Sequence, residues 1–216
     1  MHEWYAAPME GLTGWRWRQV QHEMFGGAAL YVTPFVSPNG NFSFQRKELE
    51  ELDPERNRGI PVVPQILTNR AEYFVWAAKE CRSRGWAQIE LNLGCPSGTV
   101  TGKKKGAGLL RQPELLRQLL DGIFDALPDM KISVKTRIGW ERAEEWPALL
   151  ALLETYPICR LTVHPRVRTQ FYKGAADREV FRWTAEHTAL PLCYNGDVTT
   201  VRDLREMGET FPDDAV

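Results

Sequence analysis

A cysteine at position 95 stands where its side chain could take part in acid–base chemistry. It lies between Gly94 and Pro96, just after a strand-like run that ends at Leu93. A free thiol has a pKa of about 8.5, so at neutral pH most of it carries a proton that it can donate. Burial as a small apolar side chain is the common alternative for a lone cysteine. The position of Cys95 leaves both interpretations open.

The other cysteines indicate neither a disulfide framework nor a metal site. Cys81 falls inside a predicted helix, and Cys159 and Cys193 stand where predicted strands begin, so we assign all three to core packing. The chain has 4 cysteines and no Cys-x-x-Cys spacing, which argues against zinc. We therefore expect no metal and a reducing, cytoplasmic setting.

Two cations, Lys135 and Arg137, alternate along the predicted strand 131–138 and share its inward face. A cation inside a barrel needs an anionic or polar partner. A bound phosphate or an electron-rich ring would be such a partner. So would Glu90, whose position in its own strand gives it the same inward parity. The sequence leaves a bound ligand and an internal salt bridge as alternatives.

A histidine and two arginines stand together at the end of the predicted strand 160–164. His164 closes the strand, and Arg166 and Arg168 lie just beyond it. A histidine at a strand end is commonly a structural hydrogen-bonding group. Its place at a strand end beside two arginines leaves a functional role as an equal alternative.

A short polar segment, Asn195-Gly196-Asp197, follows the predicted strand 191–195. In parallel barrels the loops after the seventh and eighth strands often bind phosphate through backbone N–H groups, and glycine permits close approach. The same tripeptide is also a common turn.

Lys103, Lys104 and Lys105 form a basic run next to Gly106 and Gly108. A solvated run of charge is the simplest interpretation. Because the run lies just beyond Cys95, it could instead contact RNA phosphates at the mouth of a catalytic site.

Strand-like and helix-like runs alternate along the chain, which predicts an α/β fold with a parallel sheet. In 88–93 and 131–138 the apolar residues fall on one face and the polar residues on the other. This division is typical of a TIM-type (β/α)8 barrel, which has helices outside and an active site at the carboxyl ends of the strands. The predicted strands are 3–7, 30–36, 61–68, 88–93, 131–138, 160–164 and 191–195.

Helices are predicted between these strands. Asn69 is expected to cap the first, with Glu72 completing a capping box, and Gly85 is expected to end it. Pro113 stands near the start of the second, whose apolar residues recur at i, i+4 spacing. The remaining predicted helices are 146–153 and 178–186.

The length of 216 residues suits a single domain, 1–216. A complete barrel typically needs about 250 residues, so we expect about seven of the eight β/α units, with an eighth strand beginning near 213–216. The chain has no signal-peptide pattern and no apolar run of the about 18 residues that a membrane span needs. At a formal net charge of -1, nucleic-acid binding would depend on local basic patches.

Short segments, in order along the chain, resemble the tRNA-dihydrouridine synthase family. Each is weak alone, but together they span nearly the whole sequence. One departure is Pro165, which stands where the family usually has glycine. The segments are Ala7-Pro8-Met9-Glu10-Gly11, Pro64-Gln65, Asn92-Leu93-Gly94-Cys95-Pro96, Gly106-Ala107-Gly108-Leu109-Leu110, Val134-Lys135-Thr136-Arg137-Ile138-Gly139, His164-Pro165-Arg166 and Asn195-Gly196-Asp197.

The resemblance implies an enzyme that binds FMN, is reduced by NADPH and acts on tRNA, with Cys95 as the general acid. The residues that it implies around FMN are Pro8, Met9, Glu10, Gln65, Lys135, His164, Asn195, Gly196 and Asp197. Those assigned to the RNA substrate are Asn92, Lys103, Lys104, Lys105, Arg137 and Arg166.

The implied reaction reduces uridine to 5,6-dihydrouridine. Hydride passes from flavin N5 to C6 of a uracil turned out of its stack, and Cys95 gives a proton to C5. The family pattern also includes an eighth strand and a helical C-terminal tRNA-binding domain, which we expect to be absent from 1–216, and a monomeric full-length protein. The alternatives are a reductase of a free pyrimidine, similar to dihydroorotate dehydrogenase, and an inactive fragment.

Overall fold

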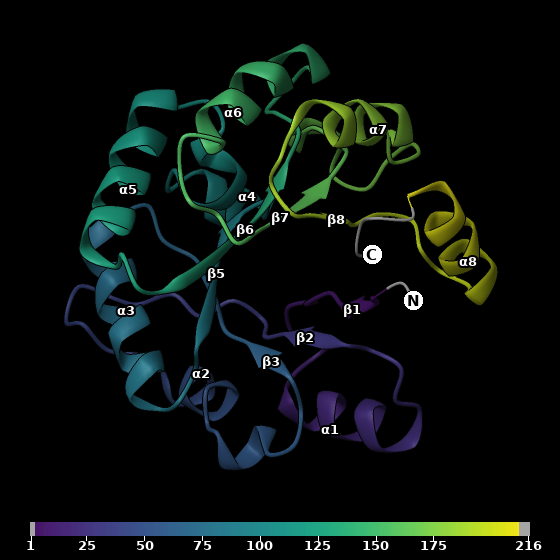
Figure 1. Ribbon diagram of the computed structural model, residues 1–216. Helices are drawn as coiled ribbons and strands as arrows, with labels where there is room; N and C mark the ends of the chain where they lie inside the picture. Colours follow the sequence, from purple (N-terminus) through teal and green to yellow (C-terminus); the bar gives the residue numbers. More distant parts are fainter. Residues whose placement is uncertain (1–2, 212–216) are drawn as a thin grey trace.

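Strands and helices alternate along the chain, with the strands at the centre and helices around them (Figure 1). The computed structural model describes residues 3–211. The strands are β1 (Tyr5–Ala6), β2 (Leu30–Val32), β3 (Val62–Val63), β4 (Gln65–Ile66), β5 (Gln88–Leu93), β6 (Lys131–Arg137), β7 (Arg160–His164) and β8 (Leu192–Tyr194). The α-helices are α1 (Trp15–Met24), α2 (Arg46–Glu51), α3 (Ala71–Ser83), α4 (Gly98–Thr101), α5 (Pro113–Ala126), α6 (Trp146–Leu153), α7 (Arg178–His187) and α8 (Val201–Thr210). Short 3-10 helices are η1 (Glu55–Asn57), η2 (Gly106–Leu109), η3 (Ala143–Glu145) and η4 (Arg168–Gln170).

Each pair of neighbouring strands is parallel, in the orders β1-β2-β3 and β4-β5-β6-β7-β8. The predicted strand 61–68 is observed as β3 and β4, separated by Pro64, which has no N–H to donate to a neighbour. β3 pairs with β2 and β4 pairs with β5, so this segment links the two sheets. The predicted α/β barrel-type fold is confirmed. The predicted start of an eighth strand near 213–216 lies outside the described residues.

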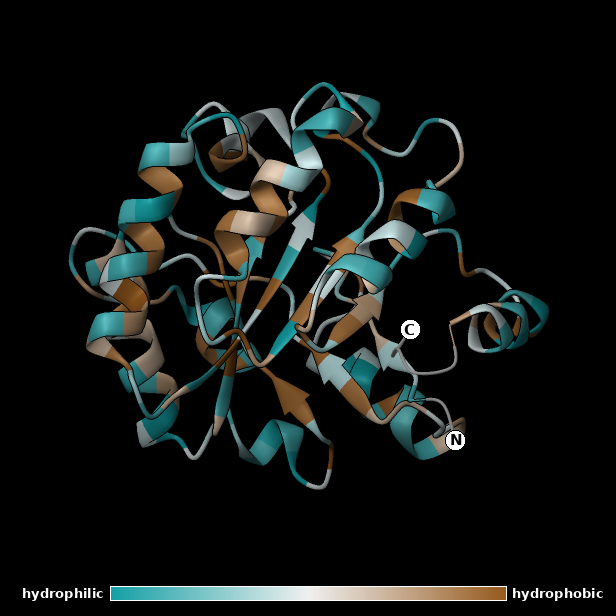
Figure 2. Cartoon of the chain, turned by 45° about the horizontal axis from the view of Figure 1, so that its top comes forward, coloured by the Kyte–Doolittle hydropathy of each residue, from teal (hydrophilic) through white to brown (hydrophobic). Residues whose placement is uncertain are grey.

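The hydrophobic core fills the space between the outer face of the strands and the helices. Ile89 and Leu91 of β5 and Val134 of β6 are fully buried. Leu116 and Leu120 of α5 belong to the same cluster. Figure 2 shows the same division, with hydrophobic residues of the surrounding helices toward the strands and hydrophilic residues outward. The alternation in β5 and β6 therefore leaves their polar residues for the barrel interior.

The register arranges these inward side chains in layers. Glu90 lies opposite Ser133, and Ser133 lies opposite Arg160. One layer nearer the carboxyl ends, Lys135 lies opposite Asn92. The sequence predicted the parity of these residues, whereas their partners depend on the register between strands.

One predicted helix cap is wrong. The residue before α3 is Arg70, and no side chain caps the helix. The side-chain amide of Asn69 instead donates to the carbonyl oxygen of Lys103 at 3.0 Å, because the turn between α4 and η2 comes close to the start of this helix. Gly85, at φ +96°, lies just beyond the end of α3, and Pro113 opens α5, both as predicted.

The sequence did not predict the bounds of helix α1, because the side chain that this helix buries is an arginine and not an apolar residue. Arg18 is fully buried and donates to Glu51 Oε2 at 2.8 Å, to Asn57 Oδ1 at 2.9 Å and to the carbonyl oxygen of Thr13 at 3.1 Å. Glu51 Oε1 also accepts the Trp15 N–H at 3.2 Å, at the positive end of the α1 dipole. This network joins α1 to α2 and η1 and so fixes the loop that follows β1.

No helix within residues 3–211 is long and apolar enough to cross a membrane.

Arg18→Ala is expected to lower the free energy of unfolding by about 3 kcal/mol, since it leaves a partly buried carboxylate and buried carbonyl and amide oxygens without their donor. Urea denaturation followed by circular dichroism measures this difference. Arg46→Ala is the matched control, because Arg46 is 93% exposed and reaches Glu50 only at 3.7 Å. The free energy of unfolding of Arg46→Ala should be close to that of wild type. Equal effects of the two substitutions would contradict the role given to the Arg18 network.

Candidate active site at the carboxyl ends of the strands

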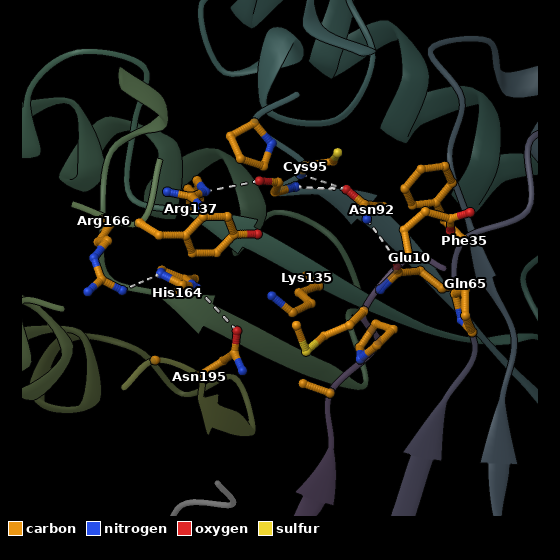
Figure 3. A pocket seen from close by; sticks show the side chains of 18 of the residues that line it. Glu10, Phe35, Gln65, Asn92, Cys95, Lys135, Arg137, His164, Arg166 and Asn195 are labelled. Carbon is orange, nitrogen blue, oxygen red and sulfur yellow. Dashed lines mark hydrogen bonds between the residues drawn. The ribbon is translucent and has the colours of Figure 1, made fainter. Parts of the chain in front are cut away.

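A cavity of about 600 Å³ opens where the strands end. It receives residues from the loops after β1, β2, β5, β7 and β8 and from the strands β4, β5, β6 and β7 themselves. Figure 3 shows Lys135 lying centrally among its labelled side chains, with Asn92 and Gln65 on one side and His164 on the other. The sequence-predicted residues that line it are Pro8, Met9, Glu10, Gln65, Asn92, Cys95, Lys135, Arg137, His164, Arg166, Asn195, Gly196 and Asp197.

The three predicted lysines do not line this cavity. Lys103 and Lys104 are exposed in the turn between α4 and η2. Lys105 is half-buried, and its Nζ donates to Ser37 Oγ at 3.0 Å. Burial lowers the pKa of Lys105, with the neighbouring Lys103 contributing. This basic run therefore lies outside the cavity.

Cys95 is held by hydrogen bonds to its backbone. Its N–H donates to Asn92 Oδ1 at 2.9 Å, and its carbonyl oxygen accepts the Ala107 N–H at 3.1 Å. Gly106 approaches so closely that an added Cβ would lie 2.9 Å from the same carbonyl oxygen, and it adopts φ +53°. Burial raises the pKa of the half-buried Cys95 thiol, so the thiol carries its proton at neutral pH.

A chain of hydrogen bonds connects Asn92 to the barrel interior. Asn92 Nδ2 donates to Gln65 Oε1 at 2.6 Å, and Gln65 Nε2 donates to Glu90 Oε1 at 2.7 Å. Glu90 Oε2 lies 3.4 Å from the guanidinium of Arg160. The loop that carries Cys95 is thus tied, through Asn92, to a buried ion pair two layers below.

The Glu90–Arg160 ion pair bears on the two alternatives that the sequence left open for Lys135, a bound ligand and a salt bridge to Glu90. Glu90 takes Arg160, because the small Ser133 separates these two residues within one layer. Among the described residues, Lys135 Nζ has no carboxylate within 4 Å. The expected alternative of a Lys135–Glu90 salt bridge is wrong, and the ammonium group is left facing the cavity. Burial lowers the pKa of Lys135, while Glu90 opposes this shift.

His164 lies between two side chains that define its tautomer. Arg166 can only donate, so the 3.0 Å contact between its guanidinium and His164 Nε2 makes that nitrogen the acceptor. Nδ1 then carries the proton and donates to Asn195 Oδ1 at 3.3 Å. Burial, followed by the charges of Lys135 and Arg137, lowers the pKa of His164 to about 3. The ring is a neutral hydrogen-bonding group at neutral pH.

One terminal nitrogen of Arg166 donates to both carboxylate oxygens of Asp197, at 2.8 and 2.7 Å. Asp197 also accepts the Ala176 N–H at 2.7 Å. Gly196, at φ +155°, packs so tightly that an added Cβ would lie 2.9 Å from the Ala176 methyl group. The predicted phosphate segment is thereby held against the loop after β7, and the hydrogen bonds of Arg166 go to the protein.

Arg137 likewise joins loops. It donates to the carbonyl oxygens of Gly94 at 3.1 Å, Val167 at 3.1 Å and Phe171 at 2.7 Å. Tyr172, which is 71% exposed, lies beneath its guanidinium at 5.3 Å and lines the cavity.

The sequence assigned no site role to Phe35, although this side chain lines the cavity. Tyr172, whose segment Gln170-Phe171-Tyr172 favours RNA over a free pyrimidine as substrate, also lines it. Phe35 stands near the carboxyl end of the predicted strand 30–36, and Tyr172 lies in the segment after the predicted strand 160–164. A position at the active-site end of a barrel is the signal that could have found them. Within residues 3–211, no three His, Cys, Asp or Glu side chains are arranged to hold a metal ion. The cavity combines the protonated thiol of Cys95 with the ammonium group of Lys135 at its centre.

Comparison with solved structures gives the class of fold. The chain superimposes with a TM-score of 0.65 on a variant of NCR from Zymomonas mobilis, at 14% identity, covering 99% of this chain and 80% of that one. It superimposes with a TM-score of 0.57 on the catalytic domain of a hyperthermophilic chitinase from Pyrococcus furiosus, at 10% identity, covering 98% and 80%. At these identities the comparison supports the TIM-barrel fold alone.

Sequence comparison gives the family. Residues 5–216 match the model of the dihydrouridine synthase (Dus) family, and the chain belongs to this family. It is 32% identical over 211 residues to the "Probable tRNA-dihydrouridine synthase" of Rhizobium leguminosarum bv. phaseoli, covering 97% of this chain and 65% of the relative. It is 32% identical over 195 residues to tRNA-dihydrouridine synthase B of Proteus vulgaris, covering 90% and 59%. The chain thus spans less than two thirds of the length of these relatives.

Stability should fall with acidification because of His164. Its pKa of about 3 in the folded state lies below the ordinary 6.5, so below pH 6.5 the unfolded chain binds a proton that the folded chain does not. This difference is worth about 2 kcal/mol between pH 7 and pH 5. Urea unfolding of wild type and His164→Gln at both pH values measures it. The glutamine variant should lose about that much less stability, and equal losses would contradict a neutral buried His164.

Proposed function

We propose that this chain carries the catalytic barrel of a tRNA-dihydrouridine synthase that uses FMN and NADPH to reduce uridine to 5,6-dihydrouridine. The observation that carries the proposal is the pairing, in one cavity, of a protonated thiol at Cys95 with the ammonium group of Lys135, which has no carboxylate partner among the described residues. Membership of the dihydrouridine synthase family supports the same reaction.

The residues around Lys135 suit an anionic ring system with a phosphate tail. Lys135 would sit against the ring, and Gln65 still has a free N–H and lone pair at its edge. His164 and Asn195 offer neutral groups beside it, and the close-packed turn at Gly196 would present backbone N–H groups to a phosphate. Pro8, Met9 and Glu10 would close the site from the loop after β1.

Bound FMN, once reduced by NADPH, supplies the hydride for C6 of the uracil. The role of the protein is to deliver the proton. Cys95 would give its thiol proton to C5, and the raised pKa keeps that proton available at neutral pH. Arg137 and Lys135 act in the opposite direction on this pKa, so they would stabilise the thiolate that remains.

RNA is the proposed partner. The reacting uridine would enter the cavity beside Asn92 and the exposed ring of Tyr172, which could stack on a base. Arg137 and Arg166 would act mainly by holding the rim. The exposed Lys103 and Lys104 would contact phosphates farther along the strand. We propose a cytoplasmic protein, monomeric at full length.

Cys95→Ala should lower dihydrouridine formation about 10²–10⁴-fold while leaving flavin content and flavin reduction by NADPH unchanged, because the thiol acts only as proton donor. Product is measured by mass spectrometry of digested tRNA, and flavin by absorbance. Cys159→Ala is the matched control, since Cys159 is also half-buried and lies outside the cavity. An unchanged yield in Cys95→Ala would exclude the assigned role, and reduction of a free pyrimidine but not tRNA would favour the alternative substrate.

Lys135→Ala should weaken FMN retention about tenfold or more, because it removes the cation without a carboxylate partner from the centre of the cavity. The combined variant Lys103→Ala, Lys104→Ala, Lys105→Ala should retain FMN but bind tRNA more weakly and with a smaller salt dependence. Flavin absorbance and filter binding at several salt concentrations distinguish the two effects. The reverse pattern, with flavin lost only in the triple variant, would contradict both placements.

A further inference from the structure

The backbone around Cys95 has its polar groups fixed by neighbouring loops. Asn92 Oδ1 accepts the N–H groups of Gly94 and Cys95 at 3.1 and 2.9 Å. Ala107 donates to the Cys95 carbonyl oxygen at 3.1 Å. The Gly94 carbonyl oxygen before the cysteine accepts from Arg137. The next backbone acceptor along the chain is the carbonyl oxygen of Pro96, one residue after the cysteine.

Arg168 completes this set from the loop after β7. Its Nε donates to the Pro96 carbonyl oxygen at 3.1 Å, and one of its terminal nitrogens donates to Thr101 Oγ1 at 3.2 Å. Pro96 lies two residues before α4, the single turn of helix that follows Cys95, and Thr101 is the last residue of that helix. One guanidinium therefore spans both ends of the segment that leads away from the thiol, which the planar fork of arginine permits and a lysine ammonium does not.

The position of Arg168 is itself fixed. Its guanidinium lies 4.7 Å from the ring centres of both Trp140 and Phe171. Its backbone N–H donates to the Gly139 carbonyl oxygen at 2.9 Å, so the loop after β7 is anchored on the loop after β6. Arg111 stacks on the same Trp140 ring at 4.2 Å. Among the described residues, Arg111 makes no side-chain hydrogen bond to the segment around Cys95.

We infer that Arg168 is a positioning residue for Cys95, which locks the segment from Pro96 to Thr101 so that the thiol keeps a single placement on the cavity rim. This inference rests on the proposed function only for its catalytic consequence; the locking of the segment is a property of the protein alone. Arg168 does not line the cavity, so it acts through the backbone rather than on the substrate. The cations that affect the thiol pKa are Arg137 and Lys135.

Alkylation of Cys95 by iodoacetamide tests the locking without cofactor or RNA. Arg168→Ala should raise the alkylation rate of the Cys95 peptide at least threefold, measured by mass spectrometry, since the half-buried thiol gains freedom to become exposed. Rates are compared across a range of pH, so that a gain in access is separated from a change in the thiol pKa, which burial raises and the Ser97 backbone N–H and Arg137 lower. The alkylation rate of Arg168→Lys should lie between those of wild type and Arg168→Ala, since lysine can keep one of the two hydrogen bonds.

Arg111→Ala is the matched control, because it removes a cation from the same Trp140 ring but leaves both hydrogen bonds of Arg168 in place. Its Cys95 peptide should be alkylated at the wild-type rate. The alkylation rate of the Cys159 peptide should be the same in every variant. Circular dichroism melting confirms that each variant is folded. An unchanged Cys95 rate in a folded Arg168→Ala variant, or an equal rise in Arg111→Ala, would overturn the inference.

Kinetics on tRNA then separate positioning from substrate contact. A misplaced thiol should lower kcat about 10–10²-fold in Arg168→Ala, with KM for tRNA changed less than twofold and flavin content unchanged. A raised KM with unchanged kcat and unchanged alkylation would make Arg168 an RNA contact and overturn the inference. Absence of dihydrouridine formation by the wild type would contradict the proposed function instead, and the alkylation result would still decide whether Arg168 locks the segment.

Discussion

The carboxylate of Glu90 is the constraint around which the barrel interior is organised. It is the only acidic side chain among the described residues that is fully buried, at 1% exposure. An ionised carboxylate in such a place needs a cation and hydrogen-bond donors. Arg160 supplies the charge and Gln65 supplies a donor. Because Gln65 then accepts from Asn92, the same interaction that neutralises the interior also orients the residue that holds the Cys95 loop.

A second consequence concerns the distribution of positive charge. With Glu90 committed to Arg160, Lys135 remains one layer higher with no carboxylate within 4 Å among residues 3–211. Burial, followed by the charges of Lys135 and Arg137, lowers the pKa of His164 to about 3 and so keeps this ring neutral. The barrel interior thus has one layer in which the charges of Glu90 and Arg160 are paired. In the next layer, which meets the cavity, Lys135 has no carboxylate partner among residues 3–211. A parallel barrel makes this separation straightforward, since all carboxyl ends of its strands meet on one side.

The rim of the cavity depends on contacts between loops rather than within them. Arg137, Arg166 and Arg168 each donate to backbone or carboxylate oxygens of a neighbouring loop. Loops on the barrel face have few contacts with the core, so such cross-links give them their shape. Glycine at 106 and 196 lets the backbones come close enough for these contacts. The arginines on this rim therefore serve first as cross-links, and only Arg137 combines that task with a cavity-facing ring contact to Tyr172.

The sequence by itself determined the strands, the inward parity of Glu90, Lys135 and Arg137, and the position of Cys95 beyond a strand end, because these depend on a local two-residue period and on turn residues. The short motifs, in their order along the sequence, also indicated the dihydrouridine synthase family. Only the tertiary structure decided that Glu90 pairs with Arg160, since that choice depends on a register across three strands with Ser133 between them. The displaced cap at Asn69 has the same origin. Local pattern fixes which way a side chain faces, whereas its partner is set by residues distant in the chain.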